Sequence, residues 1–286
     1  MKNEYIIKKS NYFIMNCKYD LSIQEQRIIL TLASMIKPTD EEFKEYKFST
    51  KEFKELLNLK GQSAYSEIPK ITKKLLGKII EIEEENEIIQ CAWISTAKHL
   101  KKEGVIILKI ASDLKPYMLQ LNTLYTSYKL KNVLSMKSKY SIRIYEILKC
   151  HEFKQQGFID ISILELRKLL KAEHIYPKYA NFKQKILEVV KTELEEQTDI
   201  SFEYEEFKTG RTITNLRIFI NKKDVIVNNF KEECVTKVKE QTKTKKIIGD
   251  MPRQKTKFHN FNETFTQYTN DELDDIIKKS QKEKFK

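Results

Sequence analysis

The apolar and polar residues of this chain follow a pattern that occurs twice, with a period of about 115 residues. Each copy opens with apolar residues at helical spacing, over residues 21–36 in the first copy and 138–151 in the second. A short alternating strand then leads into a helix that ends in a Leu-Leu pair. A longer helix follows, predicted over residues 65–78 and 179–196, and each copy closes with a β-hairpin.

Single residues mark the ends of several of these predicted helices. Ser22 lies three residues before Glu25, which predicts a capping box at the first helix. Ser49 and Ser162 hold equivalent positions in the two copies, and each is expected to cap the helix after the short strand. In the second hairpin, Gly210 suits a turn that needs positive φ.

The order helix, strand, helix, helix, hairpin is that of a winged helix. The sequence therefore predicts an α+β fold of two tandem pseudo-symmetric winged-helix domains, followed by a flexible basic linker and a short C-terminal amphipathic segment. The alternative is a small α+β domain with coincidental spacing. In the longer helices, we expect Ile68, Ile71, Leu75 and Ile79 to face inward in the first copy, and Phe182, Ile186, Val189, Val190 and Leu194 in the second.

Charge divides the chain in the same places. The formal net charge is +12, with +3 in residues 1–124, +6 in residues 125–223 and +3 in residues 224–286. We take these ranges as the first winged helix, the second winged helix and the C-terminal section. Residues 237–257 hold eight basic and two acidic residues and few apolar ones, which predicts a flexible linker. The basic excess favours an anionic partner, above all nucleic acid, although a lysine-rich proteome would also produce it.

Several classes of protein are disfavoured. No apolar run approaches the ~20 residues of a membrane helix, and the first residues lack a signal-peptide pattern, so we expect a cytoplasmic protein with no membrane partner. The four cysteines are far apart, and the sequence has no P-loop, no G-x-G-x-x-G and no paired histidines. We therefore expect no catalytic residue, metal or cofactor.

The candidate binding residues lie on the longer helices and the hairpin tips. The second helix of a helix-turn-helix enters the major groove, where lysine can bond guanine and asparagine or glutamine can bond adenine. The first copy offers mainly positive charge, which suits phosphate contacts. A merely solvated face is the alternative. The candidates are Lys178, Asn181, Lys183, Gln184 and Lys185 on the second copy, Ser66, Lys70, Lys73 and Lys74 on the first, and Lys101, Lys102, Lys208 and Arg211 at the tips.

Two stretches resemble a known family. They are residues 93–121, which contain Trp93-Ile94-Ser95 and Leu114-Lys115-Pro116-Tyr117, and residues 125–149, which contain Ser138-Lys139-Tyr140-Ser141. Both resemble the plasmid replication initiators that bind iterons, and the resemblance covers roughly residues 5–223. Gln184 departs from the basic pattern of the family's second recognition helix.

The resemblance implies a bacterial protein with two winged-helix domains that binds direct repeats in double-stranded origin DNA. It further implies monomers that initiate replication and homodimers, joined through the first domain, that repress their own promoter. Initiation would proceed by opening an AT-rich segment and recruiting host helicase-loading proteins, without covalent chemistry. A transcriptional repressor with the same fold is one alternative. A rolling-circle nicking enzyme is another, and it would need a paired-histidine metal site that the sequence lacks.

The C-terminal residues carry a separate resemblance. Asn260-Phe261-Asn262 and the pair Tyr268 and Leu273 are similar to the C-terminal peptide of DnaD-type primosomal proteins in low-GC Gram-positive bacteria. We interpret residues 250–286 as a docking peptide for a replication partner, and a disordered end without a specific role is the alternative.

Overall fold

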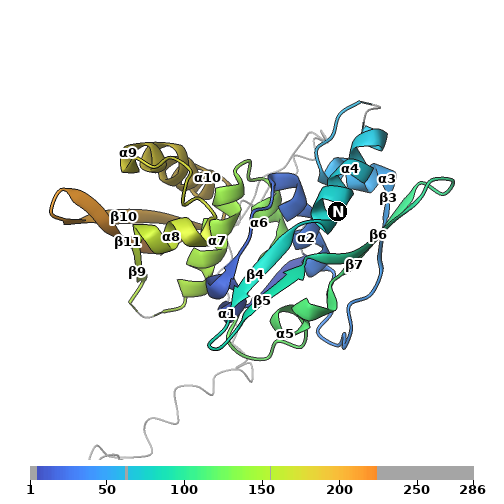
Figure 1. Ribbon diagram of the computed structural model, residues 1–286, viewed down its shortest axis with the longest axis horizontal. Coiled ribbons are helices and arrows are strands. Elements are labelled where there is room, and N and C mark those ends of the chain that lie inside the picture. Colours follow the sequence, from blue (N-terminus) through green and yellow to red (C-terminus); the bar gives the residue numbers. More distant parts are fainter. Residues whose placement is uncertain (1–4, 62–63, 155, 224–286) are drawn as a thin grey trace, which may run out of the picture. The chain divides into compact units, whose positions relative to one another are not determined.

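The computed structural model describes residues 5–61, 64–154 and 156–223 (Figure 1). The predicted linker and C-terminal peptide lie outside these residues. The chain begins with an N-terminal segment of three short elements and continues through two modules that a connecting region joins. The N-terminal segment comprises β1 (Ile6–Ser10), α1 (Asn11–Asn16) and β2 (Cys17–Lys18).

The first module follows the predicted order as far as its third helix. Ser22 caps the first helix: its hydroxyl accepts from the Glu25 N–H at 3.3 Å, and the Glu25 carboxylate accepts from the Ser22 N–H at 2.7 Å, so the predicted capping box is confirmed. Ser49 and Glu52 form a second box at the next helix. The elements are α2 (Ile23–Ser34), β3 (Tyr46–Ser49), α3 (Thr50–Leu56), α4 (Ala64–Leu76), β4 (Ile79–Glu83), β5 (Ile88–Ala92), β6 (Ile94–Leu100) and β7 (Val105–Ile110).

The closing hairpin of the first module was expected to run through residues 79–83, 88–96 and 105–110. Strands form at these positions, but they divide between two sheets instead of forming one hairpin. One sheet has the strand order β2-β4-β5, whereas β6 and β7 lie in another sheet with the order β3-β7-β6. The chain passes between the sheets at Trp93, which is fully buried with its ring edge-on to Phe13 and Tyr19. Ile79 is also not inward. Because α4 ends at Leu76, Ile79 begins β4, and strand alternation turns its neighbours Ile80 and Ile82 into the core instead.

The second module matches the predicted order throughout. Its hairpin turns at Gly210, whose φ is +63°, as expected. Ser162 caps α8 by accepting from the Glu165 N–H at 3.0 Å. The elements are α7 (Lys139–His151), β9 (Phe158–Ser162), α8 (Ile163–Leu169), α9 (Tyr179–Phe182), the π-helical segment η2 (Lys183–Leu187), α10 (Glu188–Gln197), β10 (Ile200–Thr209) and β11 (Thr212–Lys222), with strand order β10-β11-β9.

One inward residue of the second module was predicted wrongly. The helix from α9 to α10 buries Phe182, Ile186, Val190 and Leu194, each four residues after the last. Val189 lies beside this stripe and is exposed. The wide π turn inside the helix, with its i→i+5 bonding, accounts for a stripe at intervals of four rather than 3.6 residues.

The connecting region and the N-terminal segment bind to each other. Strand β1 pairs antiparallel with β8, and Ile7 lies opposite Tyr128. Side chains of the N-terminal segment enter both hydrophobic cores: Phe13 and Cys17 enter the core of the first module, and Ile7 and Ile14 that of the second. The connecting elements are η1 (Ser112–Leu114), α5 (Lys115–Met118), β8 (Tyr125–Lys129) and α6 (Leu130–Leu134).

Arg27 and Arg143 hold equivalent positions in the opening helices of the two copies, and each donates to backbone carbonyls outside its own helix. Arg27 of α2 donates to the Met136 carbonyl at 3.1 Å, in the turn before α7. Arg143 of α7 donates to the carbonyls of Ile14 and Cys17 at 2.6 and 2.8 Å. In both copies, therefore, an arginine of the opening helix ties that helix to backbone carbonyls elsewhere in the chain.

A buried carboxylate lies between the N-terminal segment and α7. Glu146 is fully buried, and Lys9, itself 2% exposed, lies 2.6 Å from it. The guanidinium of Arg143 lies 3.7 Å from the same carboxylate, and the hydroxyls of Tyr19 and Tyr128 donate to it. Every charge in this cluster is therefore paired inside the protein.

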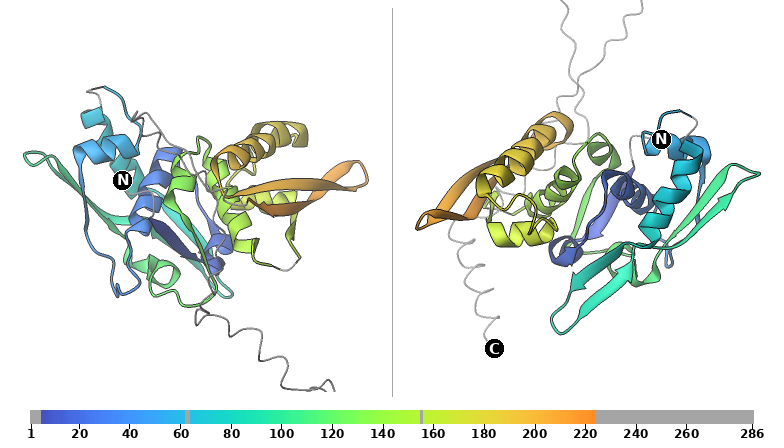
Figure 2. Two further views of the ribbon diagram at one scale, coloured as in Figure 1. Left: turned by 180° about the vertical axis from the view of Figure 1, so that it is seen from behind. Right: turned by 45° about the horizontal axis from the view of Figure 1, so that its top comes forward.

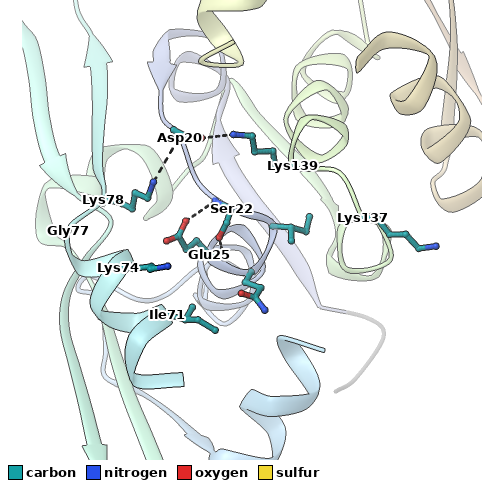
Figure 3. Close-up of a pocket in the computed structure, with 11 residues that line it drawn as sticks. Asp20, Ser22, Glu25, Ile71, Lys74, Gly77, Lys78, Lys137 and Lys139 are labelled. Atoms are coloured by element: carbon teal, nitrogen blue, oxygen red, sulfur yellow. Dashed lines mark hydrogen bonds and ion pairs between the residues drawn. The ribbon is translucent and has the colours of Figure 1, made fainter. Parts of the chain in front are cut away.

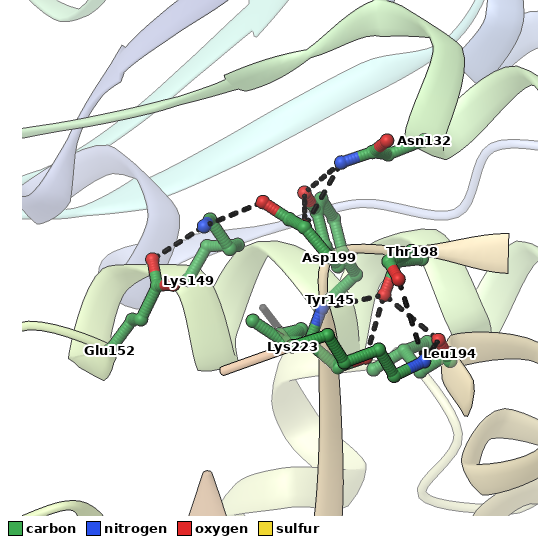
Figure 4. A network of polar contacts seen from close by, with 9 residues as sticks. Asn132, Tyr145, Lys149, Glu152, Leu194, Thr198, Asp199 and Lys223 are labelled. Atoms are coloured by element: carbon green, nitrogen blue, oxygen red, sulfur yellow. Dashed lines mark hydrogen bonds and ion pairs between the residues drawn. The ribbon is translucent and has the colours of Figure 1, made fainter. Parts of the chain in front are cut away.

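A second polar network lies around Asp199, at the C-terminal end of α10 in the second module (Figure 4). Asp199, in the turn after α10, accepts from Tyr145 at 2.8 Å and from Asn132 at 2.9 Å, and Lys149 lies 3.1 Å from it. Lys223 donates to the Leu194 carbonyl at 3.0 Å, at the C-terminal end of α10. A lysine in this position suits the negative end of the helix dipole.

Candidate nucleic-acid interface

The second recognition helix runs from α9 through η2 into α10 (Figure 1). Its buried stripe packs against the module, so its opposite face is presented outward. The turn that leads into it is held by Arg167, which the sequence analysis missed. The Arg167 guanidinium lies 4.2 Å from the Phe182 ring and donates to the carbonyls of Ala172, Ile175 and Tyr176 at 2.7–3.1 Å.

Four of the five candidates on this helix are exposed and available to a ligand. Within the part of the chain that the structure describes, their side chains make no hydrogen bond or ion pair with the protein. A helix that presents uncommitted amide and ammonium donors can bond to base edges or phosphates without first breaking contacts of its own. These four residues are Lys178, Asn181, Gln184 and Lys185.

Lys183 differs from the other four. It is partly buried, its ammonium lies 2.8 Å from the Glu206 carboxylate on β10, and it also lies over the Tyr204 ring at 5.7 Å. The hydrogen bond to Glu206 raises the pKa of Lys183. Tyr179 donates to the same carboxylate at 2.8 Å. Lys183 thus ties the recognition helix to its wing, and its base-reading role stays a prediction.

The first recognition helix, α4, carries lysines on its exposed face. Lys70, Lys73 and Lys74 are exposed, and no ion pair is formed by them among the described residues. Ser66 is exposed on the same helix. Thr72, on the buried side, lies 3.0 Å from the His99 ring on β6 and so links α4 to its wing.

Both wings extend beyond the helices of their modules (Figure 2). Lys101 and Lys102 are exposed in the turn between β6 and β7, and Thr50 donates to the Gly104 carbonyl at 2.8 Å at the end of that turn. Lys208 and Arg211 are exposed beside Gly210 at the other tip. The structure therefore places the sequence-predicted residues in four groups, two on helices and two on wings.

Among residues 5–61, 64–154 and 156–223, no group of histidine, cysteine or acidic side chains could hold a metal ion. No helix in the described ranges is long and apolar enough to cross a membrane.

Comparison with known proteins identifies both modules. Residues 6–149 match the family described as initiator replication protein, WH1, and residues 162–220 match initiator Rep protein, WH2. Both matches agree with the winged-helix prediction, which the fold confirms.

Two curated proteins of Escherichia coli are similar in sequence. A replication initiation protein is 27% identical over 204 residues, which are 67% of this chain and 62% of that protein. The PI protein is 29% identical over 152 residues, 47% of this chain and 48% of that protein. The chain thus spans less than two thirds of the length of these relatives.

A solved structure shares the fold. The crystal structure of Pi initiator protein in complex with iteron DNA superposes with a TM-score of 0.64 at 20% identity, covering 78% of this chain and 100% of that chain.

Proposed function

Because the chain belongs to the family of initiator replication proteins, we propose that it initiates plasmid replication by binding direct repeats at the origin. The observation that carries this proposal is the exposed face of the second recognition helix, where Lys178, Asn181, Gln184 and Lys185 present uncommitted donors. The similarity to a replication initiation protein and the fold shared with an initiator that was crystallised on iteron DNA support the same function.

We propose a division of labour between the two modules. The second module reads bases through its recognition helix, and the lysines of α4 and the wing tips contact phosphates. Phosphate contacts position a protein on the duplex, whereas base contacts specify the sequence. On this proposal the protein performs no covalent chemistry. It acts in the bacterial cytoplasm, exchanges between monomer and homodimer, and recruits host helicase-loading proteins.

Binding to direct repeats from the plasmid origin tests the proposal that the protein binds such repeats. We expect the protein to bind these repeats at least a thousandfold more tightly than scrambled DNA at physiological salt. Replacing Lys208 and Arg211 together with alanine should weaken binding to both DNAs alike and reduce the salt slope by about 1.8, because each lost phosphate contact removes about 0.9. Gel-shift titrations at several salt concentrations measure the affinities for the two DNAs and the salt slope. Equal affinity of the wild-type protein for repeats and scrambled DNA contradicts the proposal.

Replication itself separates an initiator from a plain repressor. We expect a plasmid that carries only this gene and its repeats to replicate. Deletion of residues 250–286 should leave repeat binding unchanged and abolish replication, because we propose that this peptide docks a replication partner. Transformant counts and gel shifts give the two readouts. Failure of the full-length gene to replicate favours the repressor, and replication by the deletion variant rules out the docking peptide.

A further inference from the structure

A groove lies between the two modules, with a volume of about 850 Å³ (Figure 3). We call it the inter-module groove. One side is formed by the end of α4 and the other by the start of α7 and the turn before it. The start of α2 also lines the groove, with the carboxylates of Asp20 and of Glu25, which is held in its capping box with Ser22. Four lysines line it: Lys74 and Lys78 from the first module, Lys137 from the turn before α7, and Lys139, the first residue of α7. Lys74 is also one of the candidates on α4, whereas Lys78, Lys137 and Lys139 belong to none of the four candidate groups, so the groove extends the positive charge of α4 toward the second module.

Two of these lysines are uncommitted. Lys74 and Lys137 are exposed, and in the described ranges neither ammonium forms an ion pair or hydrogen bond. Lys137 also lines a smaller cavity together with Leu57 and Asn58, in the turn that follows α3. This turn belongs to the helix-turn-helix of the first module, whose first helix crosses the DNA backbone in proteins of this kind. Lys137 is therefore placed on the side where DNA would pass.

The other two lysines hold a carboxylate. Asp20 lies 2.6 Å from the Lys139 ammonium and 3.9 Å from the Lys78 ammonium, so it bridges the two modules. Figure 3 shows both lysines directed toward it. Asp20 is 59% exposed. The hydrogen bond from Lys139, together with the nearby positive charges, lowers the pKa of Asp20, so it is an anion at neutral pH.

We propose that the inter-module groove binds backbone phosphates of the DNA between the segments contacted by the two recognition helices, and that Asp20 occupies their place in the free protein. A carboxylate and a phosphate oxygen make the same charge-assisted bonds to lysine. On DNA binding, a phosphate takes over Lys78 and Lys139, while Lys74 and Lys137 add contacts. The proposal rests on the proposed DNA-binding function and extends it to a site between the modules.

The two uncommitted lysines give the first test. Replacing Lys74 and Lys137 with alanine together should reduce the salt slope by about 1.8 and weaken binding to repeats and scrambled DNA by the same factor. The matched control replaces two exposed lysines outside the groove, Lys47 and Lys154, and should leave both the affinity and the slope unchanged. Fluorescence anisotropy with labelled repeat DNA at several salt concentrations measures them.

The DNA side of the contact gives the second test. Methylphosphonate linkages, which lack the phosphate charge, are placed one at a time across the repeat. At the phosphates in the groove, the neutral linkage should weaken the wild-type protein by about threefold or more and leave the double variant unaffected. Equal weakening of both proteins at every position overturns the proposal.

In a third test, a substitution at Asp20 should strengthen DNA binding, whereas the lysine substitutions should weaken it. Asp20→Asn should raise the affinity for DNA by about two- to fivefold, because it removes a negative charge that repels phosphate. If Asp20 only joins the modules, the variant will be less stable and will bind DNA no better, and the competitor role is then refuted. A wild-type protein that shows no preference for repeats refutes the proposed function instead, so the two failures are distinguishable.

Discussion

Replacing Glu146 with glutamine is expected to lower the free energy of unfolding by about 3–5 kcal/mol. The carboxylate is fully buried and pairs with Lys9 at 2.6 Å and with Arg143 at 3.7 Å. A neutral amide of the same size keeps the volume but leaves two buried cations without their counter-charge. Because Lys9 belongs to the N-terminal segment, its release should also loosen the pairing of β1 with β8. Urea unfolding followed by circular dichroism measures the loss.

The surface pair of Glu45 and Lys98 provides the control. It has a similar separation of 2.6 Å, but its side chains are 43% and 51% exposed. Glu45→Gln should therefore change the free energy of unfolding far less than Glu146→Gln does. A loss below 1 kcal/mol for Glu146→Gln would show that water or rearrangement compensates the buried lysine. In that case the cluster does not hold the N-terminal segment in place.

The same cluster predicts a dependence on pH. Burial alone would raise the pKa of Glu146, but the charges of Lys9 and Arg143, with hydrogen bonds from Lys9 and Tyr128, outweigh it and lower that pKa. The stability that this carboxylate contributes is therefore complete above the ordinary glutamate pKa and is lost as pH falls through the lower folded-state value. The difference in stability between wild type and Glu146→Gln should shrink in acid.

Replacing Asn181 and Lys185 together with alanine is expected to weaken binding to the repeats by about a hundredfold or more. Each bond pair to a base edge contributes about 1–3 kcal/mol, and both side chains are exposed on the outward face of the second recognition helix. Binding to scrambled DNA should fall much less, because only a phosphate contact of Lys185 would be lost there. Competition titrations that compare the two DNAs measure the specificity ratio.

Two variants on the same helix control this result. Lys191 is paired with Glu203 at 2.5 Å, so Lys191→Ala should change repeat binding by less than about twofold. Lys183→Ala should weaken repeat binding less than Lys185→Ala, because Glu206 already holds the Lys183 ammonium. If Lys183→Ala has the larger effect, this lysine leaves Glu206 on binding and reads a base. Equal losses on repeats and scrambled DNA would assign the whole helix to phosphate contacts.

Local signals in the sequence were sufficient for most of the fold. The capping serines Ser22, Ser49 and Ser162 accept from N–H groups in the first turns of their own helices. Gly210 adopts the positive φ that the turn between β10 and β11 requires. These features act over a few residues, so spacing alone reveals them. Such local patterns were sufficient to predict the order of elements of a winged helix in each copy.

What the sequence did not reveal depends on partners that are distant along the chain. The crossing at Trp93 requires Phe13 and Tyr19, and the burial of Glu146 requires Lys9. Lys183 has the residue type and the position of a base-reading residue, yet its ammonium pairs with the carboxylate of Glu206 on β10. The inter-module groove likewise combines the end of α4 with the start of α7, and no local pattern relates those two points.

The pairing of β1 with β8 imposes an order on events during synthesis. Ile6 lies opposite Lys129, so the first strand is made well over a hundred residues before its partner exists. At about 5–20 residues per second, the ribosome needs roughly 6–25 seconds to make that partner strand. During this interval the apolar side chains of Ile7 and Ile14 have no core to enter, since the core that receives them is translated afterwards. Residues 6–18 therefore reach their native place only after the partners translated later have been made, and in those seconds this segment is open to chaperones or to a neighbouring chain.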